Sequence, residues 1–219
     1  MEKNLSQPAS KILVIGANGG IGRQAVEIAL QAGHLVTAMV RNPASLTFVH
    51  PNLVIVKGDI LRPETFGHYL EGIDAVISAL GVKSTGPTTL YSEGNRNLLQ
   101  AMEKKEVSRV FFISASALDV SPLLPSYARF AAKYILQKIL RNMYADLRIM
   151  ESLVKASDAQ WTIIRPPRLT NKPVTGRYRV AVNAFLKNGL SISRADLAHF
   201  MINHLNDPAT YRTTVEVGY

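Results

Sequence analysis

Short apolar runs alternate with longer amphipathic stretches along most of the chain. The short runs have the length of strands, and they are apolar on both faces. Strands of this kind need a cover on each side, so the pattern predicts a mostly parallel sheet between two helical layers. About seven strands are expected, at residues 11–16, 34–40, 53–58, 74–80, 109–115, 161–166 and 213–218.

The stretches between the early strands have helical periodicity. In the first of them apolar residues recur three or four positions apart, and Gly33 follows as a C-terminal stop. Helices are expected at about 19–32, 63–71 and 88–105. This alternation predicts an α/β fold of the doubly wound Rossmann type, with helices on both faces of the sheet.

Two segments depart from simple alternation, and we interpret both as pocket-forming insertions. Residues 117–157 begin with a proline-rich loop and continue as a long helical region with an interruption near Asn142. Residues 168–194 are expected to form a small strand pair or an irregular arm on the substrate side. Both follow late strands, at the sheet edge where open α/β sheets bind ligands. We therefore expect one domain over 11–219, preceded by a flexible tail at 1–10.

Composition narrows the classes of function. The 219 residues carry a formal net charge of +9 and no cysteine, which excludes disulfides, thiolate chemistry and cysteine-ligated zinc. The basic residues are spread out, so an anionic small molecule is favoured over nucleic acid. No run has the length of a membrane span, and the N-terminal residues do not resemble a signal peptide. We expect a cytoplasmic protein, monomeric or homodimeric, with no metal, membrane or nucleic-acid partner.

A glycine cluster directly follows the first predicted strand and opens the first helix. Side chains at its second and third glycines would block a pyrophosphate or the approach of the helix to the sheet. The helix N-terminus offers free N–H groups to a phosphate. A tight turn without a ligand is the alternative. The candidate cofactor-binding residues here are Gly16, Asn18, Gly19, Gly20, Ile21 and Gly22.

The residue after the second strand distinguishes between the two nicotinamide cofactors. An acid there would accept hydrogen bonds from the adenosine ribose of NAD, but this chain has Arg41. A guanidinium can pair with a 2′-phosphate through two parallel hydrogen bonds. The sequence thus favours NADP(H) over NAD(H), the alternative being an ordinary surface arginine.

Two further strand ends carry candidate cofactor contacts. Asp59 and Ile60 follow the third strand, where the carboxylate could accept from the adenine amino group. Ala79, Leu80 and Gly81 follow the fourth strand, where small residues let the backbone approach a cofactor. Either segment could instead be a simple turn.

These motifs resemble the atypical short-chain dehydrogenase/reductases with an NmrA-like domain, and most closely the biliverdin-IXβ reductase/flavin reductase branch. The resemblance covers nearly the whole chain from residue 11. It rests on VIGANGGIG at 14–22, VRNP at 40–43, KGDIL at 57–61, DAVISALG at 74–81, GPTTLYSEGNRNLLQAM at 86–102, WTIIRPP at 161–167, TGRYRV at 175–180 and SRADLAHFM at 193–201.

The resemblance implies a Rossmann domain that uses NADPH as hydride donor and reduces a planar acceptor such as a flavin, a quinone or a linear tetrapyrrole. FMN or FAD would then be a substrate. By position, the glycines and Arg41 would hold the diphosphate and the 2′-phosphate, and Asp59 would lie at the adenine. Gly81 and Pro166 would flank the nicotinamide.

The acid–base residues of conventional family members are present only in imperfect form. Those members use a serine after the fifth strand and a Tyr-x-x-x-Lys pair, in which the cation lowers the tyrosine pKa. Tyr134 and Lys138 match the letters, whereas Tyr144 and Arg148 fit the expected register better. Alternatively, Tyr127, Phe130 and Tyr134 form a core stripe, and neither pair is an acid catalyst.

Hydride transfer to a conjugated acceptor needs mainly stacking over the nicotinamide, and the proton can come from water. Ser114 and Ser116 could orient the acceptor, and Arg168 could pair with a carboxylate or phosphate on it. The biliverdin reductase branch has histidines near the positions of Leu147 and Arg168, so their absence weakens the case for a tetrapyrrole.

Two hypotheses of function follow. The first is an NADPH-dependent reductase of a planar acceptor. The second is an NmrA-like redox sensor that binds NADP without turnover and signals to a protein partner. The degenerate tyrosine motif favours the sensor, and the insertions beside the predicted cofactor site favour a substrate. A sugar-nucleotide epimerase fits less well, because only about 50 residues follow the sixth strand.

Overall fold

A computed structural model describes residues 9–82 and 84–219. Ser10 is buried, and its amide donates to Nδ1 of His34 over 3.1 Å. Ser10 therefore does not belong to the flexible tail predicted for residues 1–10. The rest of that prediction, residues 1–8, lies outside the described part of the chain.

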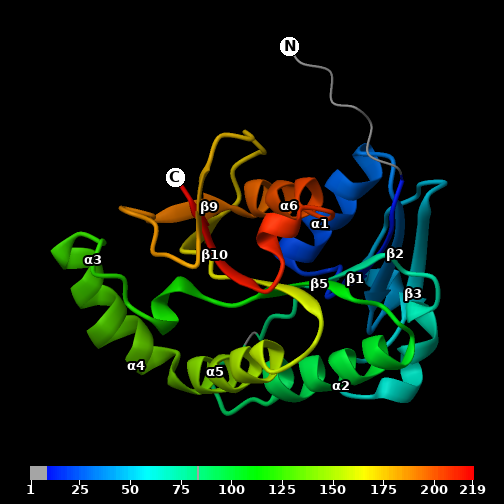
Figure 1. The fold of residues 1–219 in the computed structure, drawn as a ribbon, viewed down its shortest axis with the longest axis horizontal. Helices are drawn as coiled ribbons and strands as arrows, with labels where there is room; N and C mark the ends of the chain where they lie inside the picture. Colours follow the sequence, from blue (N-terminus) through cyan, green and yellow to red (C-terminus); the bar gives the residue numbers. More distant parts are fainter. Residues whose placement is uncertain (1–8, 83) are drawn as a thin grey trace.

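One mixed sheet organises the described residues, with eight strands in the order β3-β2-β1-β4-β5-β6-β10-β8 (Figure 1). Every neighbouring pair is parallel except β10 and β8. The doubly wound, mostly parallel α/β fold is thus confirmed, and the strand beyond the predicted seven is β8. The strands are β1 Lys11–Ile15, β2 Leu35–Val40, β3 Leu53–Lys57, β4 Ala75–Ser78, β5 Arg109–Ile113, β6 Gln160–Ile164, β8 Arg179–Val182 and β10 Thr213–Gly218.

Both faces of the central strands are buried, as the continuous apolar runs predict. In β1, Ile12 and Val14 belong to one core cluster, whereas Leu13 and Ile15 belong to the other. Helices α1 and α6 cover the first face and α2 and α5 cover the second (Figure 1). The covering helices are α1 Gly20–Gln31, α2 Leu90–Lys104, α5 Arg141–Lys155 and α6 Arg194–Asn203.

The helix predicted over 63–71 is wrong. Two 3₁₀ turns, Pro63–Thr65 and Gly67–Leu70, take its place. The Arg62 carbonyl accepts from the Thr65 amide over 2.9 Å, the i+3 bond of a 3₁₀ turn, and from the Thr65 hydroxyl over 2.7 Å. Phe66, between the two turns, leaves helical geometry with φ −136° and ψ −20°, so no continuous helix forms.

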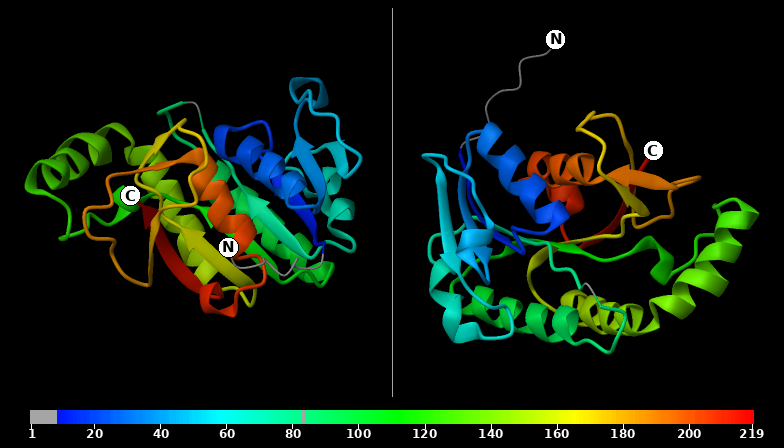
Figure 2. Two further views of the ribbon diagram at one scale, coloured as in Figure 1. Left: turned by 90° about the horizontal axis from the view of Figure 1, so that it is seen from above. Right: turned by 180° about the vertical axis from the view of Figure 1, so that it is seen from behind.

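The long helical region breaks at Leu140, close to the predicted interruption. Leu140 leaves helical geometry, with φ −100° and ψ 19°. On its N-terminal side, three consecutive segments extend outward from the end of the sheet (Figures 1 and 2). We call residues 126–139 the projecting helix. Its segments are α3 Ser126–Phe130, the π-helical turn Ala131–Leu136 and α4 Gln137–Ile139.

The core stripe predicted for this region is also wrong. Tyr127, Phe130 and Tyr134 are 68, 60 and 56% exposed. Their spacing suits a buried face, but the described chain places no element over them.

The second predicted insertion, residues 168–194, forms a small arm above the sheet. Its ends pair as a parallel two-stranded sheet, β7 Arg168–Thr170 with β9 Ser191–Ser193, and its middle supplies β8. Asp196, in the first turn of α6, anchors the arm by accepting from the backbone N–H groups of Thr175 and Gly176 and from the Tyr219 hydroxyl. Burial alone would raise the pKa of the Asp196 carboxyl, but these donors bring it below its ordinary value.

Candidate functional site

A cavity of about 960 Å³ lies at the carboxyl ends of the parallel strands. Its lining includes residues that follow β1, β2, β3, β4, β5 and β6 in turn, which is the ligand edge of an open α/β sheet. Many of the predicted site residues meet here. They are Gly16, Asn18, Gly19, Gly20, Ile21, Arg41, Asp59, Ile60, Ala79, Leu80, Gly81, Ser114 and Pro166.

The glycine loop is built to bring backbones together. Gly16 has a φ of +74°, and a Cβ there would lie 2.5 Å from the Ala79 carbonyl oxygen. Gly22 is buried beneath the loop, where a Cβ would lie 2.2 Å from the Gly16 carbonyl oxygen. These two glycines therefore fix the turn from β1 into α1, and Gly22 acts through packing without lining the cavity.

The first turn of α1 has unpaired donors toward the cavity. Gly19 is its N-cap and provides no side-chain hydrogen bond, and Gly20 leaves the backbone uncovered by any Cβ. Free N–H groups at a helix N-terminus suit a phosphate group. The residues present thus fit the diphosphate of a dinucleotide.

Arg194 is a candidate binding residue that the sequence interpretation missed. It begins α6, lines the cavity, and lies so close to the loop that a Cβ on Gly20 would be 2.6 Å from its Nε. Its guanidinium is held by a 2.7 Å hydrogen bond from Nη1 to Asn171. A second positive group therefore stands at the phosphate end of the cavity.

Arg41 lies in the turn that follows β2, where the predicted ribose phosphate would bind. Its side chain is exposed at the cavity, and no carboxylate within residues 9–82 and 84–219 forms an ion pair with it. Asn42 shapes the turn by accepting from the Ala44 amide. Asp59 lines the same part of the cavity, and its Oδ1 accepts from the Leu61 amide.

The other end of the cavity is apolar. It is bounded by residues from α5, from the segment after β6 and from the start of the arm. The sequence predicted Pro166 here and singled out the position of Leu147 only for lacking a histidine, because the apolar residues of α5 look like ordinary core positions. The others are Leu140, Met143, Leu147, Pro167 and Leu169.

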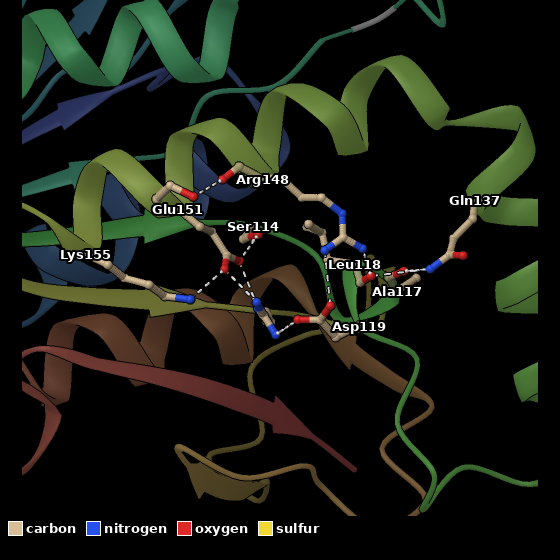
Figure 3. A network of polar contacts seen from close by, with 10 residues as sticks. Ser114, Ala117, Leu118, Asp119, Gln137, Arg148, Glu151 and Lys155 are labelled. Carbon is tan, nitrogen blue, oxygen red and sulfur yellow. Dashed lines mark hydrogen bonds and ion pairs between the residues drawn. The ribbon is translucent and has the colours of Figure 1, made fainter.

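Ser114 is the polar residue between the two ends, and its hydroxyl is already engaged. It donates to Oε1 of Glu151 over 2.7 Å, and both side chains are buried (Figure 3). Arg165 donates to both oxygens of the same carboxylate, over 2.8 and 2.6 Å, and pairs with Asp119 at 2.8 Å. Lys155 is the fourth donor to Glu151, at 3.2 Å.

This network keeps Glu151 ionised. Burial alone would raise the pKa of its carboxyl, but the hydrogen bonds from Arg165 and Ser114 and the charges of Arg165 and Lys155 bring the pKa below its ordinary value. Burial would lower the pKa of Arg165, but the hydrogen bonds and charges of Glu151 and Asp119 raise it above its ordinary value. Glu151 is therefore a fixed anion that orients Ser114, not a proton donor at neutral pH.

Tyr144 and Arg148 occupy their predicted helix but do not line the cavity. Tyr144 is buried in the core below the sheet, and burial raises its pKa above the ordinary value. Arg148 points along the outside of α5, where it donates to the Leu118 carbonyl and pairs with Asp119 (Figure 3). The structure does not bring these two side chains to the place where an acceptor would sit.

The remaining predicted catalytic and substrate residues also lie outside the cavity lining. Tyr134 and Lys138 are exposed on the projecting helix, and the Tyr134 ring packs on Phe130 with a centroid separation of 4.9 Å. Ser116 starts a short 3₁₀ turn, and its amide donates to the Pro166 carbonyl. Arg168 is exposed at the start of β7.

Two features are absent from the described residues. Within them, no three histidine, aspartate or glutamate side chains are arranged to hold a metal ion. In the same part of the chain, no helix combines the length and apolar character needed to cross a membrane.

Comparison with known proteins supports the interpretation of this cavity as a binding site for a nicotinamide cofactor. A family model for NAD(P)H-binding proteins matches residues 16–208. The photosystem II assembly factor Ycf39 of Synechocystis is 35% identical over 145 residues, which cover 64% of this chain and 44% of that protein. In three curated relatives of this kind, the matched segment covers only 33 to 44% of the relative's own length.

Solved structures share the fold over nearly the full chain. ChuY, an anaerobilin reductase of Escherichia coli O157:H7, superposes with a TM-score of 0.75 at 22% identity, covering 95% of this chain and 96% of that one. A short-chain dehydrogenase/reductase of Veillonella parvula in complex with NADP gives a TM-score of 0.76 at 19% identity, covering 96 and 94%. The chain therefore belongs to the NAD(P)H-binding family and has the Rossmann fold that these structures share.

Proposed function

We propose that the protein is an NADPH-dependent reductase of a planar, conjugated acceptor such as a flavin, a quinone or a linear tetrapyrrole. The observation that carries this proposal is the two-part cavity. A glycine loop with two arginines forms one end, and an apolar space formed by Met143, Leu147 and Pro167 forms the other. A polar cofactor with a flat apolar partner matches that division.

The preference for NADPH over NADH rests on Arg41. A guanidinium without a carboxylate partner at the end of β2 suits a 2′-phosphate, and an acid that would bind the two ribose hydroxyls is absent from that position. Arg194 and the α1 N-terminus face the diphosphate, which both cofactors share. NADPH, when bound, supplies the hydride.

The chain's own contribution is binding, orientation and exclusion of water. The apolar side chains of α5 and the two prolines after β6 would hold the acceptor flat and keep water from the reacting face. The Ser114 hydroxyl donates its hydrogen bond to Glu151, so its oxygen lone pairs are left to accept a hydrogen bond from the bound substrate. A reduced flavin or quinone can take its proton from solvent after the hydride has been transferred, so the proposal requires no positioned acid.

A redox sensor without turnover is the second candidate. It is favoured by the positions of Tyr134 and Tyr144, both of which lie outside the lining of the cavity. A sensor would bind NADP and NADPH, would not consume NADPH with any acceptor, and would pass the cofactor state to a protein partner.

Absorbance at 340 nm distinguishes the two functions. Purified protein would be mixed with NADPH and, in turn, with FMN, a quinone and biliverdin, with parallel calorimetry of cofactor binding. Acceptor-dependent loss of NADPH supports the reductase. Tight binding of NADP with no loss of NADPH for any acceptor supports the sensor.

A further inference from the structure

The projecting helix exposes a concentration of large apolar side chains unlike the rest of the surface. Tyr127 and Phe130 are 68 and 60% exposed. Solvent-exposed patches of this kind mark interaction surfaces in folded proteins. The exposed apolar side chains of the projecting helix and the loop before it are Leu123, Tyr127, Phe130, Tyr134, Ile135, Leu136 and Ile139.

This exposed helix is held in place by the body of the protein. Ala132 is buried, and the Gln137 side chain donates to the carbonyl groups of Ala117 and Leu118 over 2.9 and 3.3 Å (Figure 3). Beyond these contacts the helix extends outward past the end of the sheet in every view (Figures 1 and 2). The apolar side chains are therefore presented by a positioned element.

The charge of the same segment has a single sign. Residues 120–145 contain no aspartate or glutamate, and their four cations recur along the whole helical stretch. Lys133 Nζ stands 5.4 Å from the centre of the Tyr134 ring. The cations are Arg129, Lys133, Lys138 and Arg141.

The presence of cations without carboxylates in this segment favours an anionic partner over a second copy of the chain. Symmetric pairing of two copies through the projecting helix would bring the cations of both helices together without a carboxylate between them. An extended anionic surface gives every one of these cations a partner, and long basic side chains can reach such a surface while their stems cover apolar area. Tyrosine rings suit the level of lipid headgroups.

We propose that the projecting helix docks the protein on a membrane surface rich in anionic lipid headgroups. The helix would lie in the plane of the interface, with apolar side chains such as Phe130 among the acyl chains and Arg129 and Lys133 at the phosphates. This peripheral contact differs from a membrane span, and it is an alternative to the expectation from the sequence of no membrane partner. The inference does not depend on the proposed reductase activity.

Vesicle sedimentation tests the proposal. The full chain would be mixed with vesicles of phosphatidylcholine alone or of equimolar phosphatidylcholine and phosphatidylglycerol, at low and high salt. We expect sedimentation with the anionic vesicles only, weakened by salt. The double variant Tyr127→Glu/Phe130→Glu should lose vesicle affinity by about tenfold or more, and Arg129→Gln/Lys133→Gln should reduce both affinity and salt dependence.

Matched controls keep the outcome specific to this helix. Val49→Glu/Val54→Glu changes two exposed valines, 99 and 60% exposed, in and before β3 at the opposite end of the sheet, and should bind vesicles like the unchanged protein. Circular dichroism and NADPH affinity check that each variant is folded.

Three results would overturn the proposal. The first is the absence of binding to anionic vesicles at low salt. The second is equal loss of binding in the β3 control. The third is a dimer, by light scattering, that Tyr127→Glu/Phe130→Glu dissociates while vesicle binding stays unchanged.

Discussion

The Ser114 hydroxyl lies 2.7 Å from Oε1 of Glu151 and donates a hydrogen bond to it. In the arrangement that the sequence resemblance implied, a serine after the fifth strand would act with a tyrosine on the following helix. Here the serine's partner is an ionised carboxylate, itself held by Arg165. Ser114 is therefore held beside the cavity by a fixed network of ionised side chains.

We predict that Glu151→Gln destabilises the fold by about 2 to 3 kcal/mol at neutral pH, because it leaves the half-buried Arg165 with only Asp119 as an ionised partner. Urea unfolding monitored by circular dichroism measures the change. Glu93→Gln, at an exposed position in the first turn of α2, is the control and should change stability little. Equal stability of Glu151→Gln and the unchanged protein would contradict the assigned network.

The same network predicts the pH dependence of stability. The folded-state pKa of Glu151 lies below its ordinary value of 4.5, so its contribution is complete well above pH 4.5 and is lost as pH falls from there through the folded pKa. Asp119, whose pKa is also lowered despite its partial burial, adds to the same slope. Glu151→Gln should be less stable at pH 7 but should lose stability less steeply on acidification.

We predict that Tyr144→Phe and Tyr134→Phe each change turnover by less than about twofold, because neither hydroxyl lines the cavity. A positioned general acid contributes about 10² to 10⁴ in rate, so the measurement separates the two cases clearly. Steady-state rates with NADPH and FMN give the test. A hundredfold loss in either variant would restore that tyrosine as the proton donor.

Much of the fold and of the cofactor end could be predicted from the sequence, because both depend on local patterns. Strands apolar on both faces specify a covered parallel sheet, and Gly16 and Gly22 are demanded by contacts within the same strand–turn–helix unit. Arg41 follows β2 directly, so its position at the end of the strand could also be predicted from the sequence.

The features that the sequence did not predict depend mostly on contacts between distant segments. Arg194 reaches Gly20 because α6 packs beside α1, a relation that no local motif encodes. Periodicity in the projecting helix cannot distinguish a buried face from an uncovered one, which is why a core stripe with Tyr127 and Phe130 was one of the alternatives. In the segment 63–71, the backbone leaves helical geometry at Phe66 between two short 3₁₀ turns, which the helical pattern did not indicate.

We predict that Arg41→Ala weakens NADPH binding by about 10- to 100-fold, the value of a charge-assisted hydrogen bond, and leaves NADH binding nearly unchanged. Isothermal titration with both cofactors measures the ratio. Arg96→Ala removes an exposed arginine of α2 that does not line the cavity, and should affect neither cofactor. A parallel loss for NADPH and NADH would place Arg41 elsewhere than at the 2′-phosphate.

We predict that Arg194→Gln weakens NADPH and NADH alike, by about tenfold, because the diphosphate is common to both. Gly20→Ala should have a similar effect, since its Cβ would lie 2.6 Å from Nε of Arg194 and would displace the guanidinium. Gly67→Ala is the matched control, because a Cβ there meets nothing within 4 Å. Selective loss of NADPH alone would argue against a diphosphate contact.

The most direct test of the account is the initial rate of cofactor oxidation at 340 nm with FMN as acceptor, compared between NADPH and NADH and between the unchanged protein and Arg41→Ala. We predict that FMN-dependent oxidation is much faster with NADPH than with NADH, and that Arg41→Ala loses this preference. No FMN-, quinone- or biliverdin-dependent oxidation by protein that binds NADPH tightly would contradict the reductase and favour the sensor.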